Sequence, residues 1–156
     1  MTDMPILTRR RIEAEFAKGV YEEMKAELGE ATARRILSSA VVKLAKAGAA
    51  EMARQAPGGK PDLDSFRDIQ RFWTAEDALR TEVVASTPTE FAFNVVRCRY
   101  SEMYREMGLA ELGAILSCNR DGAFCEGYDP KLKLARTQTL MGGASHCDFR
   151  YTRSEG

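Results

Sequence analysis

Residues 79–98 read LRTEVVASTPTEFAFNVVRC, and this stretch decides the fold class. Two runs rich in β-branched and aromatic residues, 79–86 and 90–98, flank a Thr-Pro-Thr turn. Side chains on a strand alternate between two faces. One face of the second run is formed by Phe91, Phe93, Val95 and Arg97. We therefore expect two β-strands joined by a short turn.

The sequence before this stretch has the period of amphipathic helices. In the first helix, which Thr8 can cap and Gly29 can end, an apolar residue recurs every four positions. This stripe consists of Ile12, Phe16, Val20, Met24 and Leu28. A second helix is expected over residues 31–55. Its predicted buried face holds Ile36, Leu37, Ala40, Val41 and Leu44.

The segment 56–61, APGGKP, ends this helical hairpin. Beyond it, Asp62 or Asp64 can cap a third helix. The apolar positions of that helix are Leu63, Phe66, Ile69 and Trp73. The hairpin is either part of one domain or a dimerisation arm. Because the apolar surface of this hairpin is larger than one small sheet can cover, we expect a homo-oligomer.

After residue 98, two helices precede a second pair of strands. We expect a short helix over about 100–107 and a longer one from residue 110 to about 122 or 125. Strands are expected over 131–140 and 146–153, on either side of the Gly142-Gly143 turn. The chain therefore predicts an α+β fold. An N-terminal helical hairpin (1–57) and helices packed on a small antiparallel β-sheet (62–156) form a single domain over 1–156.

The composition is that of an ordinary globular protein, with 44% hydrophobic and 29% charged residues. Lys plus Arg and Asp plus Glu both total 23, and this balance argues against a nucleic-acid partner. The basic run Arg9-Arg10-Arg11 is interpreted as a solvated helix face. No apolar run reaches the roughly 20 residues of a membrane span, and no signal-peptide pattern is present. We therefore expect a cytoplasmic protein with no membrane partner.

Four cysteines in such a chain favour free thiols over disulfides. Cys118 and Asp121 are three positions apart, so a helix places them on one face. A carboxylate beside a buried thiol is costly unless it has a partner or a ligand, which makes this pair a candidate site. Cys98 and Cys125 are interpreted as buried structural cysteines.

The segment 146–151, HCDFRY, holds the second candidate thiol and the single histidine. On a strand, Cys147 faces one way and His146 the other, which weakens a dyad between them unless the glycine turn distorts the strand. His146 is thus either a general base or a structural histidine.

The cysteine spacing does not require a metal. Cys118 and Cys125 are too far apart along a helix to bind one zinc ion. We therefore expect no metal and no cofactor. A site built from Cys118, Asp121 and Cys147 is the alternative arrangement for a metal-dependent enzyme.

Residues 94–151 resemble the L-2-amino-thiazoline-4-carboxylic acid hydrolase family. The resemblance rests on the Cys118…Asp121 pair, the Arg136-Thr137…Thr139 run, the Gly142-Gly143 turn and the ending Cys147-Asp148-Phe149-Arg150. It implies a hydrolase that opens a C–N bond of a small cyclic amidine or amide, such as L-2-amino-thiazoline-4-carboxylate. The alternative is a non-catalytic domain that binds or senses a small ligand.

The resemblance also implies roles for residues. Cys147 or Cys118 would attack the ring carbon, and Asp121 would pair with the cationic amidine. Cys147 is favoured, because amides near the glycine turn can stabilise a thiolate, whereas Asp121 raises the pKa of Cys118. His146 or an acid would move protons. The candidate substrate-binding residues are Asn94, Arg97, Tyr104, Arg136 and Thr139, of which Arg97 or Arg136 would hold the substrate carboxylate.

Overall fold

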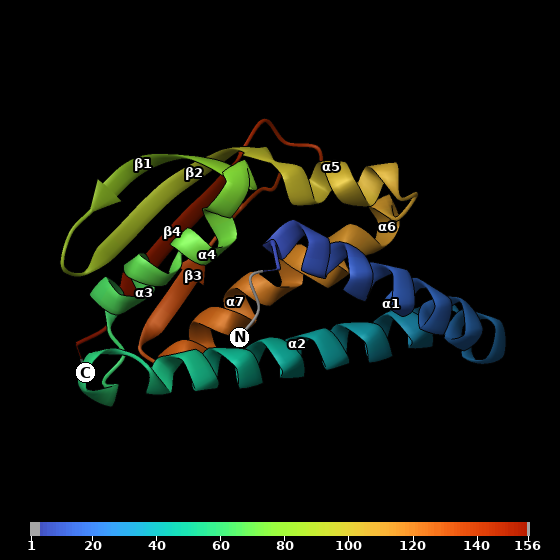
Figure 1. Ribbon diagram of the computed structural model, residues 1–156, viewed down its shortest axis with the longest axis horizontal. Coiled ribbons are helices and arrows are strands. Elements are labelled where there is room, and N and C mark those ends of the chain that lie inside the picture. The colour runs from blue at the N-terminus through green and yellow to red at the C-terminus, as the bar shows by residue number, and fades with distance from the viewer. Residues whose placement is uncertain (1–3, 156) are drawn as a thin grey trace.

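The computed structural model describes residues 4–155 and has the predicted α+β fold (Figure 1). The helices and strands are α1 (Ile6–Leu28), α2 (Glu30–Arg54), α3 (Leu63–Ile69), α4 (Arg71–Thr74), β1 (Leu79–Ser86), β2 (Glu90–Cys98), α5 (Arg99–Glu106), α6 (Ala110–Gly113), α7 (Asn119–Tyr128), β3 (Leu132–Ala135) and β4 (Cys147–Arg153). A π-helical turn, Ala114–Cys118, joins α6 to α7. No helix in this described part is both long enough and apolar enough to cross a membrane.

The strands form one antiparallel sheet in the order β1-β2-β4-β3. The prediction of β1 and β2 is confirmed with the same bounds. The register of β2 with β4 pairs Phe91 with Tyr151, Phe93 with Phe149, and Val95 with Cys147. These six side chains are buried under α2, α3 and α7, so this face of the sheet is the core face. Figure 1 shows α7 lying between the sheet and α2.

β3 is shorter than the sequence predicts. It ends at Ala135, and β4 begins only at Cys147, so residues 136–146 form a loop. The backbone amides of Thr137 and Gln138 donate to the Asp148 carboxylate at 2.9 and 3.0 Å. A side chain thus takes the place of the strand partner, and pairing between β3 and β4 stops.

The apolar stripe predicted for α1 faces solvent rather than the core, which corrects the sequence interpretation. Phe16 is 78% exposed and Ile12 is 52% exposed. The helix packs instead through the buried side chains of Ala14 and Tyr21, and Met24 is the one residue of the stripe that touches the core. The homo-oligomer expected from this stripe stays a prediction.

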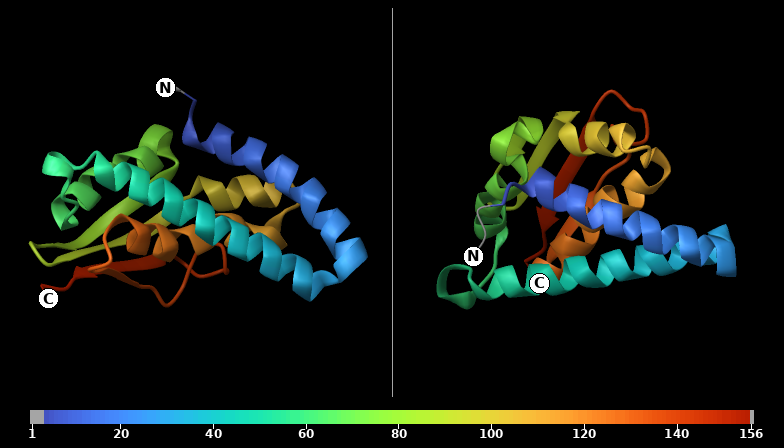
Figure 2. Two further views of the ribbon diagram at one scale, coloured as in Figure 1. Left: turned by 90° about the horizontal axis from the view of Figure 1, so that it is seen from below. Right: turned by 45° about the vertical axis from the view of Figure 1, so that its right-hand side comes forward.

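The α1–α2 hairpin extends away from the sheet, and its turn lies at the end of the molecule opposite the β1–β2 turn (Figure 1). The two helices diverge from that turn, so the beginning of α1 lies well away from the end of α2 (Figure 2). Gly29, with φ 86°, ends α1 as predicted.

The buried face of α2 is richer in alanine than the sequence predicts. Leu37 and Val41 are buried as expected, but Ala40 and Leu44 are exposed. The buried residues recur every four positions: Ala33, Leu37, Val41, Ala45, Ala49 and Ala53. Small residues on this face allow α7 to approach α2 closely. At the closest point, a Cβ added to Gly127 would lie 2.8 Å from the backbone of Lys46.

Replacing Gly127 by alanine is expected to destabilise the fold by about 1–3 kcal/mol, because the added methyl group meets backbone that cannot move aside alone. Gly19→Ala is the matched control. Gly19 is also helical, but a Cβ there has nothing within 4 Å, so this variant should be neutral or more stable by up to about 1 kcal/mol. Urea denaturation of both variants measures the difference. Equal stability of the two would contradict the close packing of α2 and α7.

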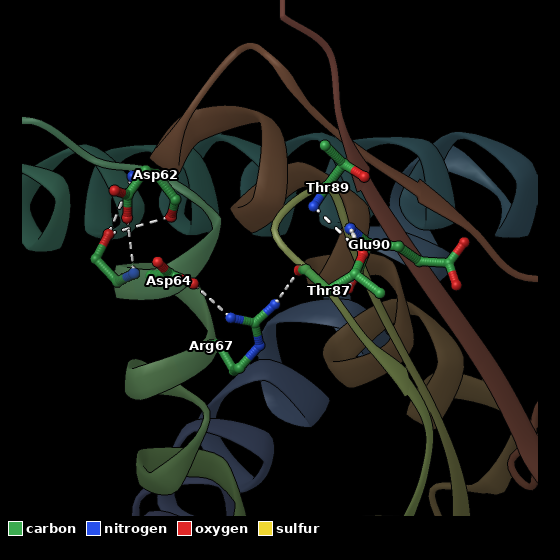
Figure 3. A network of polar contacts seen from close by, with 7 residues as sticks. Asp62, Asp64, Arg67, Thr87, Thr89 and Glu90 are labelled. Atoms are coloured by element: carbon green, nitrogen blue, oxygen red, sulfur yellow. Dashed lines mark hydrogen bonds and ion pairs between the residues drawn. The ribbon is translucent and has the colours of Figure 1, made fainter.

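A polar network fixes α3 against the turn between β1 and β2 (Figure 3). Asp62 rather than Asp64 caps α3, and it forms a reciprocal capping box with Ser65. Arg67 bonds Asp64 at 2.5 Å and donates to the Thr87 carbonyl at 2.7 Å. These contacts place α3 and its aromatic residue Phe66 over the core face of the sheet.

Candidate functional site

A cavity of about 550 Å³ lies between the helices and the core face of the sheet. Its walls come from the beginning of α1, from α2, α3, α4 and α5, from β1, β2 and β4, and from the π-helical turn and α7. Aromatic rings form a large part of the wall: Phe66, Phe72, Trp73, Phe93, Tyr100, Phe124, Phe149 and Tyr151. Three thiols also line it, those of Cys98, Cys118 and Cys147. The cavity can therefore hold a small planar molecule and expose it to reactive side chains.

Asp121 and Arg136 form an ion pair in the wall of this cavity. Arg136 Nη1 lies 2.6 Å from Asp121 Oδ2, and Arg136 Nη2 donates to the Cys118 carbonyl at 3.1 Å. The guanidinium also lies over the Phe149 ring, 5.1 Å from its centroid. Burial raises the pKa of Asp121, and the charge of Arg136 opposes that rise. The pair thus supplies a partly desolvated carboxylate that faces the ligand space.

Burial raises the pKa of all three cavity thiols, which disfavours their thiolate forms. Burial, with the charge of Asp121 added, raises the pKa of Cys118 to about 12. Burial also raises the pKa of Cys147, although the Leu140 amide donates to its sulfur at 3.2 Å and counteracts the rise. Cys98 is similar: burial raises its pKa, and the Ser101 amide at 3.4 Å opposes the rise. A nearby carboxylate, Asp121, is a leading cause of the raised pKa only for Cys118, and contributes least for Cys98 and Cys147.

The cysteines are closer together than the sequence predicts. Cys98 shares the cavity with Cys118 and Cys147, although its sequence pattern is that of a structural cysteine. Cys125 is fully buried and lies outside the cavity wall, as its structural interpretation requires. Cys98 and Cys147 lie on the neighbouring strands β2 and β4, and the π-helical turn before α7 adds Cys118.

Two predicted binding residues lie outside the cavity, on or beside the sheet. Asn94 is opposite Asp148 in the register, and its side chain accepts a bond from Arg150 at 3.0 Å on the uncovered face. Arg97 is half exposed and pairs with Glu102 at 3.1 Å. The apolar stripe of β2 therefore does not carry Arg97 into the cavity.

Three further candidates also lie away from the cavity wall. Tyr104 is fully buried between α1 and α5. Thr139 belongs to the loop after β3, where its hydroxyl oxygen accepts a hydrogen bond from the Gly142 amide at 3.0 Å. The His146 ring contacts Ser145 and Gln138, with Ser145 Oγ 2.8 Å from Nδ1. The structure therefore brings together Cys118, Asp121, Arg136 and Cys147, and leaves His146 apart from them.

Cys118 is the last residue of the π-helical turn Ala114–Cys118. Such turns insert one extra residue into a helix and are common at functional sites. Cys118 and Arg136 also line a second, more open groove of about 380 Å³ against α2. They therefore form part of the wall that separates the cavity from this groove.

Sequence reasoning missed the arginines of α1 and α7. Arg10 and Arg120 both line the cavity, with side chains that are 13% and 18% exposed. The run Arg9-Arg10-Arg11 was expected to be solvated, and Arg10 corrects that expectation. A basic residue inside a mixed-charge helix gives no sequence signal of burial, because burial here depends on how α1 packs against the other helices.

Asp148 holds the loop that carries Arg136. Desolvation opposes its ionisation, but hydrogen bonds from Thr137 and Gln138 outweigh this effect and lower the pKa of Asp148 to about 2. Because this value lies below the roughly 3.9 of an unfolded aspartate, the carboxylate stabilises the loop above about pH 4. That stabilisation is lost as the pH falls toward 2.

Asp148→Asn is therefore expected to speed hydrogen exchange at the amides of Thr137 and Gln138 at neutral pH, because a neutral oxygen is a weaker acceptor. In the unaltered protein, the same amides should lose protection only below about pH 4. Asp68→Asn, at an exposed position of α3, is the control and should change neither amide. Unchanged protection in Asp148→Asn would contradict the role of this carboxylate.

The fold is similar to two solved structures of low sequence identity. One is the phenol-responsive sensory domain of the transcription activator PoxR with phenol, which shares 14% identity at a TM-score of 0.55 and covers 86% of this chain and 71% of that one. The other is trafficking protein particle complex subunit 3 from Naegleria fowleri covalently bound to palmitic acid, with 9% identity, a TM-score of 0.55 and coverage of 95% and 96%. At these identities the similarity shows the fold alone. A comparison with curated proteins finds no match.

The family comparison is more specific, because it depends on residues along nearly the whole chain. The family model described as L-2-amino-thiazoline-4-carboxylic acid hydrolase matches residues 9–151. The match includes α1 and α2 as well as the cysteine-containing half, so it extends the resemblance seen in residues 94–151. The family name indicates a hydrolase. The chain belongs to the L-2-amino-thiazoline-4-carboxylic acid hydrolase family.

Proposed function

We propose that this protein is a hydrolase that binds a small planar cyclic amidine or amide in the cavity and opens a C–N bond of its ring. The observation that carries this proposal is the meeting of Cys118, Cys147 and the Asp121–Arg136 pair in one aromatic-walled cavity. The family name supports the hydrolytic reaction, and L-2-amino-thiazoline-4-carboxylate is the first substrate to test.

The cavity suits the shape and charge of such a ring. Rings such as Phe93 and Phe149, which stack with centroids 4.9 Å apart, offer flat apolar surfaces. A protonated amidine is planar and cationic, and the Asp121 carboxylate can accept two hydrogen bonds from it. Because burial disfavours the charge of Asp121, a cationic ligand recovers part of the lost solvation.

We assign the attack on the ring carbon to Cys147. Its sulfur accepts the Leu140 amide, which favours thiolate, whereas Asp121 beside Cys118 disfavours thiolate there. In this scheme the sulfur bonds to the ring carbon and the thiol proton passes to the ring nitrogen, which leaves as the amine when the C–N bond breaks. Water then adds to the same carbon and the thiol is released. Since burial raises the pKa of Cys147, its proton needs an acceptor, and the ring nitrogen regains a basic lone pair as the sulfur adds to the amidinium carbon and accepts that proton.

The direct test is turnover of L-2-amino-thiazoline-4-carboxylate, followed by mass spectrometry of the carbamoyl product, alongside a panel of cyclic ureas and lactams. The proposal expects ring opening of at least one compound, and rapid quenching should trap an adduct on the peptide that contains Cys147. Binding of these compounds without any turnover would refute the hydrolase.

That outcome would favour the second candidate, a domain that binds a small ligand without reaction. The observation that favours it is the raised pKa of every cavity thiol, which makes each thiol a weak nucleophile. A phenol-responsive sensory domain has a similar fold, and phenol is a small ring molecule. Iodoacetamide labelling separates the two candidates, since only the hydrolase needs a thiol that reacts faster when a substrate-like cation is bound.

A further inference from the structure

The cavity has a large excess of positive charge. The whole chain is balanced, with 23 basic and 23 acidic residues. The charged residues that line the cavity are not balanced: Arg9, Arg10, Arg120 and Arg136 against Asp121. A cavity walled mostly by apolar groups strengthens the field of such charges, so the excess favours an anionic ligand.

The ion pairs of these arginines show which of them lack a full counter-charge and can bind that anion. Arg136 is already paired with Asp121 at 2.6 Å. Arg10 and Arg120 share Glu13, which lies 2.5 Å from Arg10 but 3.7 Å from Arg120. Within residues 4–155, no other acidic side chain forms an ion pair with either of them. Two guanidinium groups therefore share one carboxylate.

Both guanidinium groups are largely removed from water, with side chains 13% and 18% exposed. Burial lowers the pKa of Arg120, and the charge of the neighbouring Arg10 lowers it further, so the two cations repel each other. Arg120 Nε donates to the Leu116 carbonyl at 2.7 Å, which fixes the plane of its guanidinium. A fixed, desolvated guanidinium with an incomplete counter-charge binds a carboxylate well.

We propose that Arg10 and Arg120 form an anion subsite that binds the carboxylate of a planar ligand, while the ring of that ligand lies against Trp73, Phe93 and Phe149. This inference rests on the proposed function for its cavity and deepens it by naming the residues that hold the carboxylate of the ligand. It also replaces Arg97 and Arg136 in that role, because Arg97 is outside the cavity and Arg136 already has Asp121 as its partner.

The test compares two probes that share a ring and differ in charge, benzoate and benzamide, by titration calorimetry at pH 7. We expect the unaltered protein to bind benzoate at least about tenfold more tightly than benzamide. Arg10→Gln and Arg120→Gln should each remove most of this preference and leave benzamide binding unchanged. Arg120→Lys, which keeps the charge but loses the planar fork, should retain part of it.

Arg11→Gln is the matched control. Arg11 lies on the same helix but outside the cavity wall, its side chain is 47% exposed, and its ion pair with Glu106 is long at 4.0 Å. This variant should bind both probes as the unaltered protein does. Equal binding of benzoate and benzamide by the unaltered protein would overturn the subsite, and this comparison needs no variant to fold. Equal weakening of both probes in Arg10→Gln would also overturn it, since a structural role would produce that result.

Failure of the anion subsite and failure of the hydrolase proposal can be told apart. A protein that prefers benzoate through Arg10 and Arg120 but opens no thiazoline ring would keep the subsite and lose the proposed reaction. A protein that opens 2-amino-2-thiazoline and its 4-carboxylate with the same kcat/KM would keep the reaction and lose the subsite. The subsite predicts that the carboxylate form has the higher kcat/KM by at least about tenfold.

Discussion

Cys147→Ala is expected to reduce ring opening of the best substrate by at least about a thousandfold, because removal of a covalent nucleophile leaves only binding and positioning. The same variant should bind benzoate nearly as the unaltered protein does, since the sulfur is not part of the charged wall. Steady-state turnover and calorimetry together measure this separation of chemistry from binding.

Two control variants make the expectation specific to Cys147. Cys125→Ala removes a thiol that is fully buried but outside the cavity, so it should lower stability without lowering kcat. Cys118→Ala should weaken turnover less than Cys147→Ala, because burial and the charge of Asp121 raise the pKa of Cys118 to about 12. Full activity of Cys147→Ala would exclude covalent catalysis by that residue. Activity lost only in Cys118→Ala would identify Cys118 as the nucleophile.

The second large effect is expected from the Asp121–Arg136 pair. Asp121→Asn leaves the Arg136 guanidinium in the cavity wall without its anion and should destabilise the fold by about 2–3 kcal/mol. This estimate is below the about 3–5 kcal/mol of fully buried pairs, because the Asp121 side chain remains 35% exposed. Arg136→Gln should cost a similar amount, and urea denaturation measures both.

The double variant, with Asp121→Asn and Arg136→Gln combined, tests whether the two residues act as a unit. Because it removes both charges, its loss of stability should be smaller than the sum of the single losses by at least about 1 kcal/mol. The exposed pair of Arg97 and Glu102 is the control, and the same double-mutant cycle there should give a coupling below about 1 kcal/mol. Simple additivity at Asp121 and Arg136 would show that the ion pair contributes little in solution.

The sheet could be predicted from sequence because its determinants are local. The β-branched and aromatic runs and the proline turn define both strands, alternation as far as Val95 gives the core face of β2, and the register then places Cys147 on that face. The prediction of β3 failed at Arg136, where the Asp148 side chain binds the backbone in place of a strand. Nothing in the alternation of residues 131–140 indicates that competition, which depends on a residue ten or more positions away.

The charged part of the cavity could not be predicted in the same way. Asp121 and Cys118 were linked by helical spacing, but Arg10 is more than one hundred positions from Arg120 and meets it only through the packing of α1. Phe16 and Ile12 misled the helical analysis for a related reason, since periodicity shows that a stripe exists but not which side the core occupies. Long-range packing decides both points.

The cavity wall contains residues from the first helix and from the last strand, so the binding space exists only when the two ends of the chain have come together. A molecule that occupies it must therefore favour the folded over the unfolded chain. At a concentration of one hundred times its dissociation constant, such a molecule adds about 2.7 kcal/mol to the free energy of unfolding. For a domain of this size that corresponds to a rise in melting temperature of roughly 5–10 °C. Melting curves recorded across a library of small ring acids would therefore find the natural ligand before any reaction is known.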